Sequence, residues 1–164
     1  MAPSRRETPA AASPMLATLG GKRQIVTITA LRAVGLDAGS GKLLWEYPWT
    51  TEYDINSAQP IVVGANRVLI SSGYGHGAAV LENGPDGAKK IWENKKLKNK
   101  FNSSVFVDGY VYGFDESIFT CIDPKTGEAM WKAGRYGYGQ VLAASVVIFL
   151  GVGLVSWRPA PKST

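Results

Sequence analysis

The chain has 164 residues, of which 18 are Lys or Arg and 13 are Asp or Glu, so its formal net charge at pH 7 is +5. With 45% apolar and only 19% charged residues, the composition excludes a wholly disordered chain and suits one soluble domain. Its 19 glycines and 9 prolines show no Gly-X-Y period, which excludes collagen and favours turn-rich β structure over a helical bundle.

The N-terminal segment, residues 1–14, has no apolar run of the roughly 7–15 residues that a secretory signal needs. We therefore expect a solvated, disordered tail there. Apolar runs follow near 15–19, 24–29, 33–36 and 42–47. Because the runs are short and turn residues separate them, they predict four β-strands in one unit, about 15–48.

Two further units repeat this plan. The second, about 58–94, has apolar runs at 60–63, 67–71, 78–81 and 90–93. The third, about 103–133, has them at 104–107, 110–114, 118–122 and 128–132. In the third unit Asp108 and Gly109 separate the first two runs. Asp-Gly between β-rich runs indicates a hairpin, because glycine accepts the positive φ of a primed turn.

The C-terminal stretch 141–157 is mostly apolar and is at the short limit for a membrane-spanning helix. Its β-branched and aromatic run at 146–150, followed by Gly151 and Gly153, favours short strands over a membrane anchor. We predict a partial fourth unit over 139–158 that stops after its third strand, and a tail over 159–164.

A short motif recurs in the first three units. The pattern Asp-x3-Gly-x3-Trp occupies 37–45 and 123–131 at identical spacing. A looser copy has Glu82 in the aspartate position and one additional residue between Gly87 and Trp92. The tryptophans of successive copies are 47 and 39 residues apart, which is near the length of one four-stranded propeller blade.

These residues resemble the pyrroloquinoline-quinone-like (PQQ-like) repeat family, whose blades carry a D-x-x-T/S-G-K/E-x-x-W stretch. The resemblance covers about 15–157 and implies an all-β fold: a partial β-propeller of about three four-stranded blades plus part of a fourth. In that family the tryptophan docks adjacent blades. The resemblance therefore implies blade-docking roles for Asp37, Gly41, Trp45, Gly87, Trp92, Asp123, Gly127 and Trp131.

Members of this family are quinoprotein dehydrogenases, which hold PQQ and calcium on the propeller axis, or cofactor-free scaffolds such as the lipoprotein of outer-membrane β-barrel assembly. Both usually have about eight blades and act outside the cytoplasm. The resemblance implies a periplasmic or secreted location, and a segment of a longer protein or a chain that self-associates to cover its open blade edges. We expect further repeats and an export signal in the flanking coding sequence.

Catalytic chemistry has little support in the residues. The Gly-rich stretch 73–78 has the spacing of a dinucleotide fingerprint but lacks the helix that must follow it. With one histidine, His76, and no paired carboxylates, no hydrolytic site is assigned. Cys121 lies in a predicted strand, where we expect a buried inert thiol. We assign no catalytic, cofactor-binding or metal-binding residues.

A basic cluster occupies 89–100, with six lysines. Nucleic-acid binding is not favoured, because phosphate-tracking surfaces interleave such charge with more aromatic residues or arginines. We interpret the cluster as a solvated loop between blades, able to attract an acidic partner or a membrane surface weakly and with salt sensitivity.

Loops 51–57, 72–77 and 99–103 combine polar and aromatic residues near a predicted axial opening. We predict that Tyr53, Asn56, Phe101 and Asn102 share one binding face. The loop that carries Tyr74 and His76 is expected on the opposite face. The alternative is the ordinary polarity of surface loops.

Two functions fit these observations. The favoured one is a non-catalytic binding scaffold for a protein or small ligand, with no cofactor, no nucleic acid and no membrane span. The competing one is part of a quinoprotein alcohol or sugar dehydrogenase with PQQ and calcium. Against it, the chain lacks an adjacent cysteine pair and an assignable calcium ligand set.

Overall fold

The structure, a computed structural model, describes residues 12–144, 147–151 and 154–157, and these form only strands, turns and irregular segments. Blade 1 consists of β1 (Met15–Leu19), β2 (Lys22–Ile28), β3 (Arg32–Asp37) and β4 (Leu43–Pro48). Blade 2 consists of β5 (Ile61–Gly64), β6 (Arg67–Ser72), β7 (Gly77–Gly84) and β8 (Gly87–Asn94). Blade 3 consists of β9 (Val105–Val107), β10 (Tyr110–Asp115), β11 (Ile118–Ile122) and β12 (Ala129–Arg135). Blade 4 consists of β13 (Val141–Ala144), β14 (Val147–Gly151) and β15 (Leu154–Trp157).

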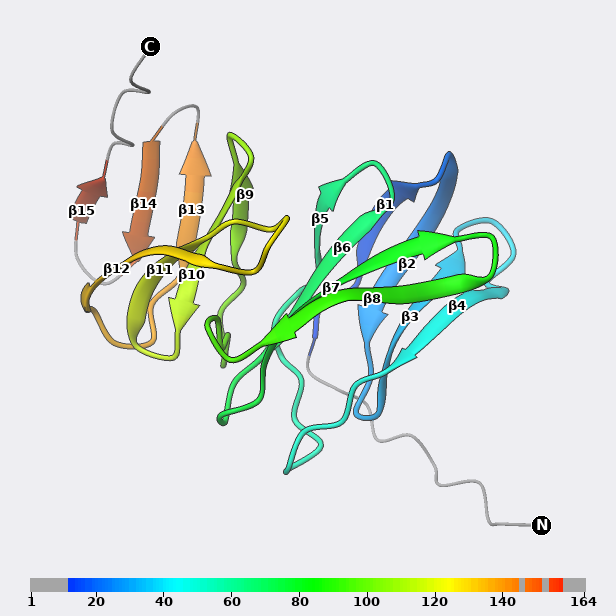
Figure 1. Cartoon of the computed structure of the whole chain (residues 1–164), viewed down its shortest axis with the longest axis horizontal. Helices are drawn as coiled ribbons and strands as arrows, with labels where there is room; N and C mark the ends of the chain where they lie inside the picture. Colours follow the sequence, from blue (N-terminus) through cyan, green and yellow to red (C-terminus); the bar gives the residue numbers. More distant parts are fainter. Residues whose placement is uncertain (1–11, 145–146, 152–153, 158–164) are drawn as a thin grey trace.

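Each blade is an antiparallel meander whose strands pair in chain order. Figure 1 shows the blades following one another from the N-terminal sheet at the right to the C-terminal sheet at the left. Among the first strands, β9 contacts both β5 and β13, and the last strands β4 and β8 also lie side by side. This arrangement confirms the predicted all-β fold, a partial propeller of three four-stranded blades and part of a fourth.

The core lies between the blades, because alternate residues of each strand point to opposite faces of its sheet. Between blades 1 and 2, Val26 and Trp45 pack with Ile70 and Leu81. Between blades 2 and 3, Leu69 and Val80 pack with Val111 and Ile122. A third cluster, around Phe114 and Phe119, joins blade 3 to Val141 of blade 4. The hydrophobic effect thus holds the sheets face to face.

The two close copies of the motif form the same turn. In each, the glycine N–H donates to the aspartate carbonyl four residues earlier: Gly41 to Asp37 over 2.9 Å and Gly127 to Asp123 over 2.8 Å. Both glycines are left-handed, with φ of 72° and 75°. This conformation favours glycine, which has no Cβ to clash with the backbone. The recurring spacing therefore reflects a shared turn geometry.

The third copy differs. Blade 2 joins β7 to β8 through a short hairpin in which Gly84 pairs with Gly87. Glu82 lies in β7, where its carboxylate accepts a 2.9 Å hydrogen bond from Arg67. Blade 2 therefore lacks the longer turn of its neighbours, which is why its motif matches only loosely.

The two terminal regions of the chain can be compared with the tails and strands that the sequence predicts. Residues 141–157 contain strands β13, β14 and β15, and within the described residues no helix is long and apolar enough to cross a membrane. The predicted tail over 1–14 is too long, because Ala12 is buried in the core and the Pro14 carbonyl accepts a hydrogen bond from Gln59. The rest of that tail and the tail over 159–164 lie outside the described residues.

Candidate binding face

Loops at the two ends of the molecule differ in origin. Because antiparallel strands alternate in direction, the turn between the second and third strands of a blade and the connection to the next blade lie at the same end, here called the loop end. The expectation that loop 72–77 faces away from 51–57 and 99–103 is therefore wrong. Tyr74 makes edge-on ring contacts with both Tyr53 and Phe101. The remaining turns, including those that carry the motif, lie at the opposite end, the turn end.

Five side chains gather at the loop end, and we call them the aromatic face: Tyr53, Tyr74, Lys100, Phe101 and Tyr138. The ring centroid of Tyr74 lies 5.6 Å from that of Tyr53 and 6.3 Å from that of Phe101. Tyr53, Phe101 and Tyr138 are 58%, 58% and 56% exposed. The face thus draws on all three connections between blades and on the β6–β7 turn.

Lys100 joins the rings of this face. Its ammonium lies 4.4 Å from the ring centroid of Tyr74, 5.0 Å from that of Tyr138 and 5.8 Å from that of Phe101. Cations within about 6 Å of an aromatic centroid are attracted by the ring quadrupole. Lys100 therefore links connection 95–104 to the β6–β7 turn and to connection 136–140.

The backbone of the β6–β7 turn is conformationally strained at Tyr74 and closely packed at Gly73. Tyr74 has a φ of 55°, a left-handed conformation that is uncommon for a bulky residue. The neighbouring Gly73 approaches connection 95–104 so closely that a Cβ there would meet the Lys100 Cα at 2.8 Å. Packing against this connection therefore holds the Tyr74 ring in place, and such strained positions concentrate at functional sites.

A buried hydrogen-bond chain lies beneath the face. The Trp49 indole N–H donates to the Ser72 hydroxyl over 2.9 Å, and this hydroxyl donates to Asn56 Oδ1 over 2.5 Å. The Asn56 amide in turn donates to the Thr29 carbonyl over 2.9 Å. Asn56 is fully buried, so its polar atoms anchor connection 49–60 instead of meeting a ligand.

The next connection is anchored in a similar way. The Ser71 hydroxyl accepts the Asn99 N–H, while the Asn99 side chain donates to the Phe114 carbonyl and accepts from Ser104. Asn102 donates to the Gly139 carbonyl over 3.0 Å and is also buried. Asn56 and Asn102 thus lie under the aromatic face, whereas Tyr53, Tyr74 and Phe101 form part of it.

His76 lies in the same turn as Tyr74. Its ring meets that of Trp49 edge-on, with centroids 4.3 Å apart. Burial lowers its pKa from the ordinary 6.5, the Glu93 carboxylate opposes this shift and Lys95 adds to it. Its Nε2 is buried without a hydrogen-bond partner among the described residues. The neutral imidazole therefore acts as a packing group at the base of the turn.

Most lysines of the basic cluster are paired. Lys98 and Lys132 both form ion pairs with the buried carboxylate of Asp115. Lys90 pairs with Glu93, and Lys96 pairs with Glu128. The cluster therefore ties connection 95–104 to blade 3, and Lys100 is the member that reaches the aromatic face.

The motif tryptophans occupy the seams between blades, each in its own way. Trp92 N–H donates to the Pro124 carbonyl of blade 3 over 2.8 Å, and its ring packs on Gly127. Trp45 is 4% exposed in the cluster between blades 1 and 2, but its N–H donates to Gln24 of its own sheet. Trp131 packs on Tyr112 and Phe119 within blade 3.

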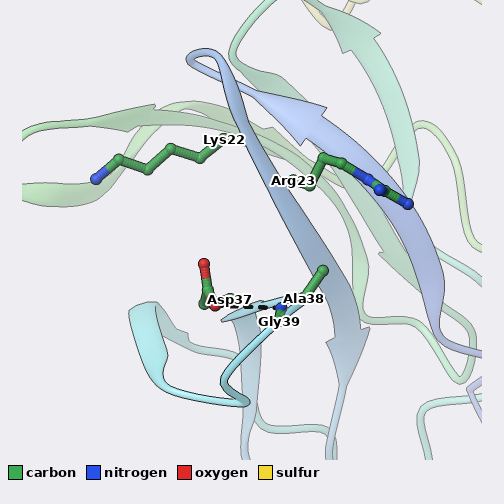
Figure 2. A pocket seen from close by; sticks show the side chains of 5 residues that line it. All are labelled: Lys22, Arg23, Asp37, Ala38 and Gly39. Atoms are coloured by element: carbon green, nitrogen blue, oxygen red, sulfur yellow. Dashed lines mark hydrogen bonds between the residues drawn. The ribbon is translucent and has the colours of Figure 1, made fainter.

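A shallow depression of about 420 Å³ lies at the turn end. Lys22, Arg23, Asp37, Ala38 and Gly39 line it, and Figure 2 shows the two basic side chains pointing away from each other. The Asp37 carboxylate accepts hydrogen bonds from the Ser40 hydroxyl and from two backbone N–H groups of its turn, and these bonds lower its pKa. The carboxylate therefore stabilises its own turn through these hydrogen bonds.

A quinoprotein would need a calcium site. Among the described residues, no three His, Cys, Asp or Glu side chains gather in a metal-binding group. Burial raises the pKa of the Cys121 thiol to about 11, which disfavours the reactive thiolate. We derive no catalytic step from these groups.

Sequence reasoning missed Trp49, Lys100 and Tyr138. Each lies in a connection between blades, and a signal was present: every connection contains at least one aromatic residue. Their convergence depends on how the blades stack, which no local pattern encodes.

Taken together, fold and site define a repeat-built propeller segment whose connections form an exposed aromatic face. Residues 3–133 match the profile of the family described as outer membrane protein assembly factor BamB, so the chain belongs to this family of PQQ-like repeat proteins. None of the curated proteins matches the sequence.

Two solved structures have a similar fold. The crystal structure of BamB from Moraxella catarrhalis is 19% identical, with a TM-score of 0.53, and the match covers 83% of this chain and 45% of that one. A europium-containing methanol dehydrogenase is 14% identical, with a TM-score of 0.48, and the match covers 80% of this chain and 36% of that one. The chain therefore spans less than half the length of the solved proteins it matches.

Proposed function

We propose that this chain is a non-catalytic scaffold of outer membrane protein assembly that binds a partner protein through its aromatic face. Family membership supports the class, because the matching profile carries the description of an assembly factor. The arrangement of the loop end supports the mode of action.

The observation that carries this proposal is the exposure of the aromatic face. Three of its rings are more than half exposed, although they lie on a well-anchored backbone. Tyrosine and phenylalanine are enriched in protein interfaces, because a rigid ring buries a large area with little loss of conformational freedom. Asn56 and Asn102 hold these connections from below, so the rings are ordered before a partner arrives.

Charge supports an acidic partner. The chain has a formal charge of +5 and a pI near 9.4, and the Lys100 ammonium lies at the middle of the face. Electrostatic attraction of this kind accelerates association and weakens as salt screens it. We expect binding to weaken steeply between low and physiological ionic strength.

A periplasmic location is part of the proposal, since outer membrane proteins are assembled on that side of the outer membrane. A tagged chain expressed from its own gene is expected in the periplasmic or outer-membrane fraction. Recovery in the cytoplasmic fraction alone contradicts this assignment.

The test of the scaffold function is site-specific photo-crosslinking in the native organism. A photoreactive phenylalanine analogue replaces Tyr53 or Phe101, and the same analogue at Met130 is the control, because Met130 is 53% exposed but lies on β12. We expect the two face positions to cross-link a component of outer membrane protein assembly that Met130 does not. Failure to capture such a component, or identical products from all three positions, overturns the proposal.

The competing dehydrogenase function has its own experiment. The chain is titrated with PQQ and calcium while absorbance and thermal unfolding are followed. We expect no saturable change, because the described residues offer no ligand set. Saturable binding together with dye-linked alcohol oxidation would favour the dehydrogenase.

A further inference from the structure

The rings of the aromatic face form a row across the loop end. Tyr53 contacts Tyr74, and Tyr74 contacts Phe101, with ring centroids 5.6 Å and 6.3 Å apart. The Lys100 ammonium extends the row to Tyr138, because it lies 4.4 Å from the centroid of Tyr74 and 5.0 Å from that of Tyr138. The row therefore runs from the connection between blades 1 and 2 to the connection between blades 3 and 4.

The Tyr53 side of the row is acidic. Glu52 and Asp54 flank Tyr53 in its connection, and Glu52 is exposed. Neither carboxylate forms an ion pair with another residue that the structure describes. Arg32, at the loop end of blade 1, pairs with Glu46 instead. This side of the row therefore has an excess of negative charge.

The other side of the row is basic. Lys100 lies among its rings, and the same connection contains Lys98 and the exposed Lys95. Lys98 shares the buried Asp115 carboxylate with Lys132, so two ammonium groups surround one carboxylate. Together these groups leave an excess of positive charge beside blade 3.

The β10–β11 turn borders the basic side and adds one charge of each sign. The Glu116 carboxylate accepts a 3.4 Å hydrogen bond from the Gly75 N–H, next to Tyr74. The Arg135 guanidinium donates to the Ser117 hydroxyl over 3.2 Å. Because these two charges are opposite, the lysines decide the sign of this side.

We propose that the aromatic face binds its partner protein in one orientation, through an apolar segment that is acidic at one end and basic at the other. The acidic end lies over Lys100, and the basic end lies beside Glu52 and Asp54. This inference rests on the proposed scaffold function and adds the chemistry of the segment that makes contact.

Each part of the segment has a counterpart in the face. Its apolar middle covers the rings, which bury a large area on contact. Its charged ends fix the register, because complementary charges favour one docked arrangement and like charges oppose the reverse one. The overall charge of +5 attracts an acidic partner from a distance, whereas the local pattern decides which end of the segment lies where.

The first test locates the cross-links within the partner. The component captured by the photoreactive analogue at Tyr53 or at Phe101 is digested, and the cross-linked residues are identified by mass spectrometry. We expect Lys or Arg next to the residue captured from position 53, and Asp or Glu next to the residue captured from position 101. Both residues are expected in one short segment.

The outcomes of this mapping separate the two proposals. If a component of outer membrane protein assembly is captured but the neighbouring charges are alike or reversed, the orientation is wrong and the scaffold function stands. If no such component is captured, the scaffold function fails and this inference fails with it. The native charges are kept throughout, so the result does not depend on the folding of a charge variant.

The second test uses synthetic peptides with one shared apolar centre. The mixed peptide is acidic at one end and basic at the other, and two further peptides are acidic or basic at both ends. Fluorescence anisotropy at low ionic strength measures their dissociation constants. We expect the native chain to bind the mixed peptide about three- to tenfold more tightly than either of the others, which is the range expected for exposed ion pairs. No saturable binding, or equal binding of all three, contradicts the inference.

Charge reversal on the face is expected to change this preference. Glu52→Lys combined with Asp54→Lys makes both sides of the row basic, so the peptide that is acidic at both ends becomes the tightest ligand. The controls are Asp86→Lys and Lys125→Glu, which reverse exposed charges in turns at the turn end. Both controls are expected to keep the preference for the mixed peptide. A preference that the double variant retains, or that the controls also change, overturns the proposal.

Discussion

The two ends of the molecule are built by different means. At the turn end, Asp37 and Asp123 close nearly identical turns through bonds to residues within four positions in sequence. At the loop end, Asn56 reaches Thr29, and Asn102 reaches Gly139, across 27 and 37 residues. The repeat therefore specifies the turn end through local contacts, whereas the aromatic face forms only after the blades have packed.

The largest expected effect comes from substituting the glycines of the two matching turns, which differ in what surrounds them. Gly41 and Gly127 share the same left-handed φ, but a Cβ at Gly41 meets open space while one at Gly127 meets the Trp92 ring at 2.7 Å. Gly41→Ala is expected to cost about 1–2 kcal/mol of unfolding free energy from backbone strain alone. Gly127→Ala is expected to cost about 2–4 kcal/mol, because overpacking adds to that strain.

Urea unfolding of the two glycine variants provides the measurement. Equal losses would show that Trp92 does not rest on the blade 3 turn.

The next effect concerns the anchors of the loop end. Asn56→Ala leaves the Thr29 carbonyl and the Ser72 hydroxyl without their buried partner, so we expect a loss of about 1–3 kcal/mol. Hydrogen exchange is expected to accelerate in connection 49–60 and in the β2–β3 turn together. Acceleration confined to the mutated loop contradicts the anchoring role.

The aromatic face itself is expected to contribute little to stability. Tyr74→Asn removes the ring contacts but relieves the left-handed strain, since asparagine tolerates positive φ. We expect the unfolding free energy to change by less than about 1 kcal/mol while partner cross-linking at Phe101 disappears. Retained cross-linking indicates that Tyr74 is not part of the contact surface.

The smallest expected effect is on the pH dependence of the unfolding free energy, which differs between His76 at the loop end and Asp37 at the turn end. Burial lowers the His76 pKa below 6.5, so the stability from its neutral form is complete above pH 6.5 and is lost as pH falls through the folded pKa. Hydrogen bonds from Ser40 lower the Asp37 pKa below 3.8, so its contribution is complete above pH 3.8 and is lost only below that value.

Denaturant unfolding across this pH range distinguishes the two groups. His76→Phe keeps a ring against Trp49 and is expected to flatten the profile just below pH 6.5. Asp37→Ala is expected to leave that region unchanged. If His76→Phe does not change how the unfolding free energy depends on pH, the loss of stability just below pH 6.5 does not come from His76.

The same contrast explains what the sequence predicts. The turns follow from local pattern, because the Asp108-Gly109 turn and the turns at Asp37 and Asp123 need only neighbouring residues. The predicted all-β partial propeller is confirmed. The aromatic face was predicted less well. Tyr53 and Phe101 are exposed as expected, but placing His76 on the opposite face overlooked the alternation of strand direction. Asn56 is buried because of contacts to Thr29 that no local pattern reveals.

Lys100 has a further consequence for how copies of the chain meet. Its charge stands among the rings of Tyr74, Phe101 and Tyr138. When two molecules approach through their loop ends, their ammonium groups come together and repel. A single cation thus discourages self-adhesion at this end, leaving it free for an unlike partner that brings negative charge of its own.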